Sequence, residues 1–214
     1  MEDASMNHVL RTIFFSIFLI AGPTLVFGKA SESSQPPTGP IASLRAHDKK
    51  VSILLENQGD TLQTVISDSL KLRINSIFDF NELSKLALGT HWEQITEQDK
   101  EKFINTFSAI IREQNFDTFL NYYRDGKLNY EKQHVNGETA TVNASAPLKR
   151  GSVSIEYSMH VVDKTWRIYD VTIDSVSTAE GNRKRYDRYI KKHSYKKLIL
   201  QLEKQLDRLK HTRE

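Results

Sequence analysis

The chain has 214 residues, with 30 Lys or Arg against 27 Asp or Glu, and contains no cysteine. The absence of cysteine excludes small folds held by disulfides and zinc sites built on thiolates. The positive charge is concentrated at the end: residues 181–214 hold twelve bases and four acids, whereas residues 29–180 hold seventeen bases and twenty-one acids.

Residues 13–27 form an apolar stretch without charge, preceded by Arg11 and followed by small residues. This layout is typical of a secretory signal peptide. An uncleaved membrane anchor is the alternative, but Gly22-Pro23 interrupts the stretch, which is shorter than the ~20 residues of a spanning helix. We therefore predict a cleaved signal peptide over residues 1–30 and a disordered, proline-rich lead over residues 31–40.

Two helical patterns follow the lead. The first has Leu44, Val51, Leu54 and Leu55 on one face, and the second runs over residues 62–77. Apolar residues at helical spacing form one buried face, so both segments are predicted to pack against a core.

The boundary of the next helix is well marked. Asp79 is suited to N-cap it, Glu82 to complete a capping box, and Phe78 to pack on Leu83 as a hydrophobic staple. Gly89 suits the position just after the end of this short helix.

Thr96 and an acidic first turn then predict the start of a long helix. Its apolar residues recur at helical spacing, which is typical of ordinary core; the wall of a cavity is the alternative. These residues are Phe103, Phe107, Ile110, Ile111, Phe116, Phe119, Leu120 and Tyr123.

After Gly126 the apolar residues alternate, which predicts strands over residues 128–135, 139–148, 152–161 and 165–175. Asn136-Gly137 between the first two is a strong hairpin signal. In the fourth strand the alternation breaks: Trp166 and Ile168 share one face, whereas Tyr169, Val171 and Ile173 share the other. Either this strand is buried on both faces or a bulge switches its register.

The chain ends in predicted helices that carry a leucine-rich stripe. Helices, then four strands, then helices indicate a single α+β domain over residues 41–210, with a four-stranded twisted antiparallel sheet.

The sequence carries no recognisable catalytic motif or metal-ligand spacing, and its seven histidines are scattered. Asp170 and Asp174 are separated by roughly 13 Å along a strand, too far for a glycosidase-like pair. We expect Asp170 to accept hydrogen bonds from a neighbouring backbone group or hydroxyl, and His160 to be solvated on the polar face of its strand. The sequence therefore predicts a protein that is not an enzyme and needs no cofactor or metal.

The basic end of the chain permits three interpretations. A nucleic-acid surface is improbable for an exported protein, and a solvated helix face is the plainest alternative. Contact with an anionic membrane or an acidic partner is the functional one, with Arg183, Arg185, Lys191 and Lys192 as candidates.

Two groups of residues form a recognisable pattern. The first group is Phe78-Asp79-Phe80, Ala87-Leu88-Gly89, His91-Trp92 and Thr96, and the second is Trp166-Arg167-Ile168-Tyr169-Asp170-Val171 followed by Asp174-Ser175-Val176-Ser177. Together they resemble the MlaC (toluene-tolerance) family of periplasmic phospholipid-binding proteins, which includes a branch associated with hopanoid gene clusters. The resemblance spans residues 40–205. One departure is that the Asn-Tyr pair of the family is replaced here by Gly181-Asn182.

The resemblance implies helices and a twisted sheet that enclose an apolar cavity for acyl chains. It further implies a periplasmic carrier of phospholipid or hopanoid between the inner and outer membranes. Its partners would be an inner-membrane lipid ABC transporter with an MCE-type component and an outer-membrane lipoprotein complex, with no nucleic acid. The alternatives are an enzyme on a similar cone-like α+β fold and an interaction module that docks through its basic C-terminal helix.

If the long helix faces the apolar side of the sheet, their side chains wall the cavity. The lipid-contacting residues expected on this basis are Phe103, Phe107, Ile110, Phe116, Phe119, Tyr123, Val153, Ile155, Tyr157, Met159, Trp166 and Tyr169.

Overall fold

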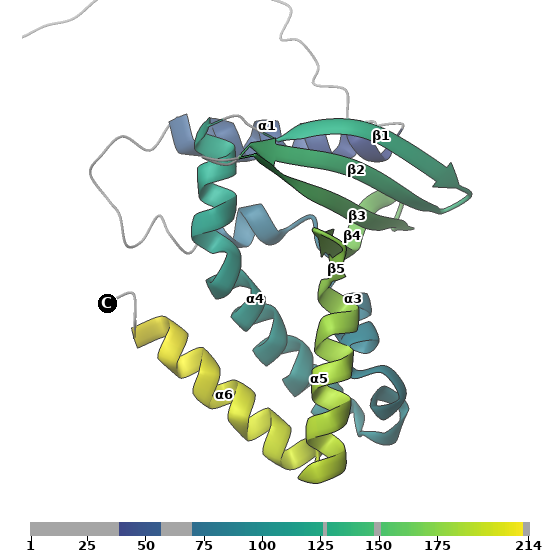
Figure 1. Ribbon diagram of the computed structural model, residues 1–214, viewed down its shortest axis with the longest axis vertical. Coiled ribbons are helices and arrows are strands. Elements are labelled where there is room, and N and C mark those ends of the chain that lie inside the picture. Colours follow the sequence, from purple (N-terminus) through teal and green to yellow (C-terminus); the bar gives the residue numbers. More distant parts are fainter. Residues whose placement is uncertain (1–38, 57–69, 126–127, 148–150, 212–214) are drawn as a thin grey trace, which may run out of the picture. The chain divides into compact units, whose positions relative to one another are not determined.

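The first part of the fold is helical (Figure 1). The computed structural model describes residues 39–56, 70–125, 128–147 and 151–211, with the backbone alone at 115 and 117–125. The signal peptide, nearly all of the lead and the first half of the second helical pattern lie outside these residues, and so do the side chains of Phe119 and Tyr123. The helices are α1 (Pro40–Glu56), a helical segment over residues 70–75, α3 (Phe80–Leu88), the 3-10 helix η1 (Gly89–Gln94) and α4 (Glu97–Asp125).

Asp79 caps α3 as predicted, because its Oδ1 accepts the N–H groups of Asn81 and Glu82. The second bond of the predicted capping box, from the backbone N–H of Asp79 to the side chain of Glu82, is wrong. The N–H of Asp79 donates to the carbonyl of Ile168 at 2.7 Å, and the side chain of Glu82 pairs with Lys85 instead. The chain therefore attaches to the sheet at the residue where α3 begins.

The predicted hydrophobic staple is replaced by other packing. Phe78 stacks on Phe80, with ring centroids 5.5 Å apart, and packs against the apolar face of the sheet. Leu83 belongs to a separate cluster formed by helices.

Gly89 ends α3 as predicted, with φ 56° and ψ −129°, a conformation that side chains strongly disfavour. A Cβ atom at this position would lie 2.9 Å from Cδ of Arg183 on a later helix. We expect Gly89→Ala to lower the free energy of unfolding by ~1–3 kcal/mol, measured by urea denaturation. Adding Arg183→Ala should recover the steric part of the loss and leave the backbone part. Wild-type stability for Gly89→Ala alone would contradict the argument.

The sheet is antiparallel with strand order β1-β2-β3-β4-β5. Its strands are β1 (Asn129–Asn136), β2 (Thr139–Pro147), β3 (Ser152–Val162), β4 (Thr165–Ile173) and β5 (Val176–Ser177). The four predicted strands are present, and β5, two residues long, is an addition that the sequence did not indicate. The first hairpin is where it was predicted, but Asn136 pairs with Thr139, so Gly137 and Glu138 form its two-residue loop.

The bulge alternative for β4 is confirmed. Ser158 pairs with Asp170 and Met159 with Ile168, so Tyr169 is the extra residue. The bulge lets Ile168 and Val171 face the same side of the sheet although they are three residues apart, and both are buried there.

Two helices complete the chain: α5 (Thr178–Lys192) and α6 (Tyr195–His211). Ser177 N-caps α5, because its Oγ accepts the N–H of Glu180. α5 packs on α3, and α6 packs on α4 (Figure 1).

Gly181 and Asn182, where the chain departs from the family pattern, lie in the first turns of α5. Asn182 bonds back to the carbonyl of Thr178, and a Cβ at Gly181 would meet no atom within 4 Å. Because glycine is a poor helix former, we expect Gly181→Ala to raise the free energy of unfolding by ~0.5–1 kcal/mol. Urea denaturation measures the change, and a loss of stability would show that the bare backbone is needed here.

The buried residues form separate clusters. The sheet-face cluster lies between α1 and one face of the sheet and includes Leu44, Ile77, Tyr130, Val142, Val153, Ile155, Tyr157, Met159, Trp166, Ile168 and Val171. The helical cluster joins α3, α4, α5 and α6 and includes Leu83, Leu88, Phe103, Phe107, Ile110, Ile111, Ala179, Tyr186, Leu198, Ile199 and Leu202. A smaller cluster of Val51, Leu70, Ile74 and Phe116 joins α1 to α4.

Candidate functional site

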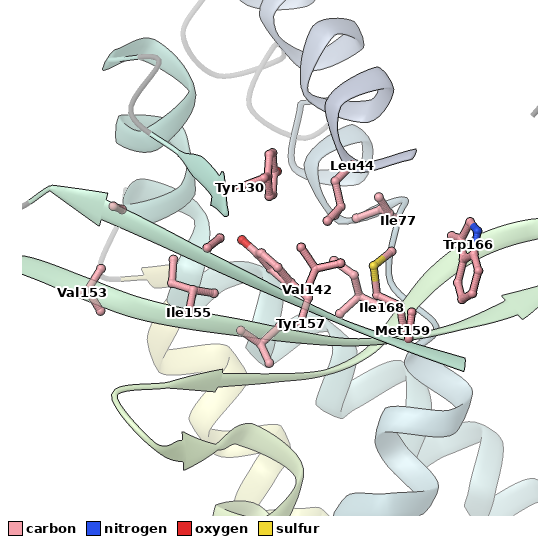
Figure 2. Packing of buried hydrophobic residues seen from close by; sticks show 14 residues of the cluster. Leu44, Ile77, Tyr130, Val142, Val153, Ile155, Tyr157, Met159, Trp166 and Ile168 are labelled. Atoms are coloured by element: carbon pink, nitrogen blue, oxygen red, sulfur yellow. The ribbon is translucent and has the colours of Figure 1, made fainter. Parts of the chain in front are cut away.

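The sheet-face cluster brings together five of the residues predicted from the sequence. Val153, Ile155, Tyr157 and Met159 of β3 and Trp166 of β4 are all buried on the same face. Figure 2 shows Leu44 of α1 and Ile77 above the side chains of the strands. In this layer, apolar side chains of α1 and of the segment before α3 face apolar side chains of the sheet.

A small cavity lies inside this layer. It is lined mainly by apolar and aromatic side chains, and its volume is about 20 Å³, room for roughly one water molecule. The lining residues include Leu44, Ile74, Ile77, Leu128, Tyr157 and Ile168, with His47, Asp48 and Tyr130 as its polar members.

Polar contacts fasten α1 over the sheet beside the cavity. The hydroxyl of Tyr130 donates to Asp48 at 2.6 Å, and the backbone N–H of Ile41 donates to Gln133 on β1 at 3.0 Å. The ring Nε2 of His47 lies 2.9 Å from the carbonyl of Arg73, in the position of a donor. These contacts were not predicted, because their partners are far apart in the sequence.

The remaining predicted residues lie elsewhere. Phe103, Phe107 and Ile110 are in the helical cluster, where the ring centroid of Tyr186 lies 5.9 Å from that of Phe103 and 6.1 Å from that of Phe107. Phe116 belongs to the small cluster at the other end of α4. Tyr169, at the bulge, is half-buried and packs on the ring of His160, with centroids 5.0 Å apart. The described side chains of the aromatic stripe on the long helix therefore do not form one wall together with the sheet.

Asp170 has the structural role predicted for it. One carboxylate oxygen accepts the N–H groups of Val171 and Ala179 at 2.9 Å each, and the other accepts the hydroxyl of Ser177. Asp170 is 9% exposed and anchors the first turn of α5 to β4. Both carboxylate oxygens are thus engaged in hydrogen bonds within the fold.

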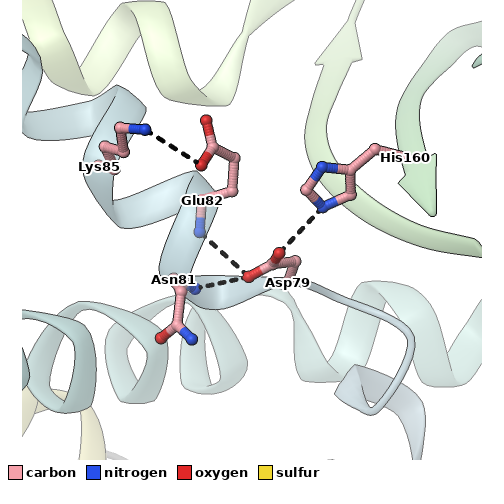
Figure 3. A network of polar contacts seen from close by, with 5 residues as sticks. All are labelled: Asp79, Asn81, Glu82, Lys85 and His160. Atoms are coloured by element: carbon pink, nitrogen blue, oxygen red, sulfur yellow. Dashed lines mark hydrogen bonds and ion pairs between the residues drawn. The ribbon is translucent and has the colours of Figure 1, made fainter. Parts of the chain in front are cut away.

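The prediction that His160 is simply solvated is wrong. Its Nε2 lies 2.9 Å from Oδ2 of Asp79, and only 24% of the histidine side chain is exposed (Figure 3). Asp79 thus caps α3 with one oxygen and holds β3 with the other. The pair is a joint between the sheet and the helices.

A second histidine–aspartate contact joins η1 to α5, where Nε2 of His91 lies 2.9 Å from Asp187. The pKa of Asp187 is held below 3.8 by a hydrogen bond from Lys191 and, second, by that from His91. A carboxyl group whose pKa is lowered by folding stabilises the folded state fully when the pH is above its ordinary pKa. This stabilisation is lost as the pH falls through the lowered pKa. We therefore expect a carboxyl NMR titration midpoint below 3.8, raised more by Lys191→Met than by His91→Gln. An unshifted midpoint in the wild type would contradict both contacts.

The four basic residues predicted to contact a membrane or partner are all exposed on α5. Arg183 lies against Gly89 and near Glu180, Arg185 lies over the ring of Tyr186, and Lys191 pairs with Asp187. Lys192 stands at the end of the helix.

Two features are absent from the described residues. These residues contain no group of three or more His, Cys, Asp or Glu side chains placed to hold a metal ion. Within the same residues, no helix has the length and apolar character needed to cross a membrane.

Three comparisons with known proteins place the chain. A search of curated proteins finds no match. Among solved structures, the fold is similar to that of a phospholipid-binding protein from Ralstonia solanacearum, determined in complex with a phospholipid. The TM-score is 0.62 and the identity 16%, over 78% of this chain and 97% of that one. The model of the MlaC protein family matches residues 45–204, well over half of the chain, and the chain therefore belongs to the MlaC family.

Proposed function

We propose that the protein binds a phospholipid or a hopanoid, with the apolar part of the lipid in the layer between α1 and the sheet. Membership of the MlaC family supports this, and so does the similar fold of a protein from Ralstonia solanacearum that was determined with a phospholipid. The observation that carries the proposal is the cavity inside the sheet-face cluster, with apolar side chains from α1, the segment after residue 70 and the strands.

The cavity of about 20 Å³ is far smaller than the ~300–1,000 Å³ of ordinary ligand pockets. α1 must therefore move away from the sheet for an acyl chain to enter. A sixteen-carbon chain gains roughly 12 kcal/mol on leaving water, at ~0.8 kcal/mol per methylene. Moving α1 would break two hydrogen bonds, one between Tyr130 and Asp48 and one between Ile41 and Gln133. The gain from burying the acyl chain is large enough to offset their loss.

Binding of this kind needs no general acid or base, so the proposal is a carrier and not an enzyme. An enzyme on a similar fold would need convergent polar groups in the cavity. The cavity lining is mainly apolar, and its carboxylate, Asp48, already accepts the hydroxyl of Tyr130.

By family, the carrier would work in the periplasm after export through a cleaved signal peptide. It would take lipid from or deliver it to an inner-membrane lipid ABC transporter with an MCE-type component, and exchange it with an outer-membrane lipoprotein complex. The helical cluster would then stay fixed while α1 and the sheet move apart.

Photo-crosslinking tests where the lipid lies. Benzoylphenylalanine in place of Tyr157, which lines the cavity, should crosslink lipid in cells, and mass spectrometry of the purified protein should detect the crosslinked lipid as an added mass, which serves as the label. The same residue in place of Val135, which is 45% exposed on β1, is the matched control and should stay unlabelled. Absence of label at Tyr157, or equal label at both positions, would contradict the proposed site.

A further inference from the structure

The two last helices carry more positive charge than their own acids can neutralise. Over residues 178–211 there are eleven Lys or Arg and four Asp or Glu. Glu180 is paired with Lys184, Asp187 with Lys191, and Glu203 with Lys102 of α4. The excess charge of α5 and α6 therefore faces solvent.

Part of this charge follows one stripe of α6. The inner face of α6 packs into the helical cluster through Leu198, Ile199 and Leu202. The outer face, with Tyr189 of α5, lines an open groove of about 650 Å³. The α6 residues of this groove include Lys197, Leu200, Lys204, Asp207 and Arg208. We refer to Tyr189 and these five residues as the α6 groove.

Leu200 is the unusual member of the α6 groove. It is 54% exposed, on the side of α6 away from the core. Lys197 and Lys204 stand three residues before it and four after it, which places them beside it on the same helix face. An exposed leucine between lysines is the arrangement of helices that lie on a lipid surface, with the apolar side chain inserted and the ammonium groups at the phosphates.

We propose that the α6 groove docks the protein on the surface of an anionic lipid bilayer. The proposal rests on the proposed function, because a lipid carrier must reach the membrane. An anionic bilayer fits the positive charge of the α6 groove, because its phosphate headgroups are anionic and are spread over a surface. A protein partner is less well matched, because the cores of protein interfaces are depleted in lysine, and two lysines flank Leu200 at the centre of the stripe.

Vesicle co-sedimentation tests the docking. The mature protein should bind vesicles of phosphatidylcholine that contain phosphatidylglycerol, should not bind phosphatidylcholine alone, and should be released by raised ionic strength. Replacing Lys197 and Lys204 by Gln should weaken partitioning about fivefold per lysine, hence about 25-fold together. The matched control is Lys49→Gln with Lys50→Gln, two exposed lysines of α1. It should bind like the wild type.

A second variant isolates the apolar part. Leu200→Ser should weaken binding several-fold, whereas Leu72→Ser, at a leucine that is 60% exposed outside the α6 groove, should not. Lack of vesicle binding by the wild type, or equal losses in the test and control variants, would overturn the docking and leave an acidic protein as the occupant. Lipid extracted from the same samples separates the two proposals. Bound lipid without vesicle binding contradicts the docking alone, and vesicle binding without bound lipid contradicts the carrier.

Discussion

Replacing Asp170 by Ala is expected to lower the free energy of unfolding by about 3 kcal/mol or more. The carboxylate is buried and accepts two backbone N–H groups and a hydroxyl. Its removal leaves the N–H of Ala179, which is itself buried, without its acceptor. Urea denaturation measures the loss, and hydrogen exchange of the Ala179 amide should become faster than that of amides in α4.

Asp174 provides the matched control. It lies four residues further along the chain, is exposed, and accepts one N–H group, that of Ser154, at 3.1 Å. Asp174→Ala should therefore cost less than ~1.5 kcal/mol. Similar losses for Asp170→Ala and Asp174→Ala would show that the anchoring of α5 does not depend on the buried carboxylate.

Replacing Phe107 by Ala is expected to lower the free energy of unfolding by about 3–5 kcal/mol. Phe107 is fully buried in the helical cluster, stacked on Phe103 and edge-on to Tyr186. Because this cluster is apart from the cavity, the variant that remains folded should carry the same lipids as the wild type. Denaturation gives the stability, and mass spectrometry of extracted lipid gives the distribution of acyl-chain lengths.

Tyr157→Ala removes a buried aromatic ring of similar size from the wall of the cavity. It should shift the acyl-chain distribution, because it enlarges the space between α1 and the sheet. A shift in Phe107→Ala with none in Tyr157→Ala would place the lipid in the helical cluster and contradict the proposed site.

The two ends of α3 and the start of α4 could be predicted because each depends on neighbours in the sequence. Asp79 and Thr96 accept N–H groups two or three residues ahead of them, and Gly89 is required by its own backbone angles. The break in alternation after Ile168 also depends on residues along one strand, and it left two alternatives: a strand buried on both faces or a bulge. The structure has the bulge.

The side-chain hydrogen bonds that join different helices and strands could not be predicted. Asp79 and His160 are 81 positions apart, and Asp48 and Tyr130 are 82 apart. Nothing local to either residue identifies the other. Each position alone fitted a simpler role, a helix cap for Asp79 and a solvated residue for His160.

The aromatic stripe on α4 shows a different limit. Periodicity indicates that a face is buried but does not identify what buries it. At 29 residues, α4 is roughly 43 Å long, so its two halves meet different neighbours. Phe103 and Phe107 pack on α5 and α6, whereas Phe116 packs near α1.

Native mass spectrometry of the mature protein purified from cells, followed by organic extraction, tests the carrier most directly. The account predicts a population heavier than the polypeptide by the mass of a phospholipid or hopanoid, which extraction removes and identifies. Protein from which the lipid has been removed should regain it from vesicles. A polypeptide that is free of lipid as purified, and that takes up neither phospholipid nor hopanoid, would contradict the account.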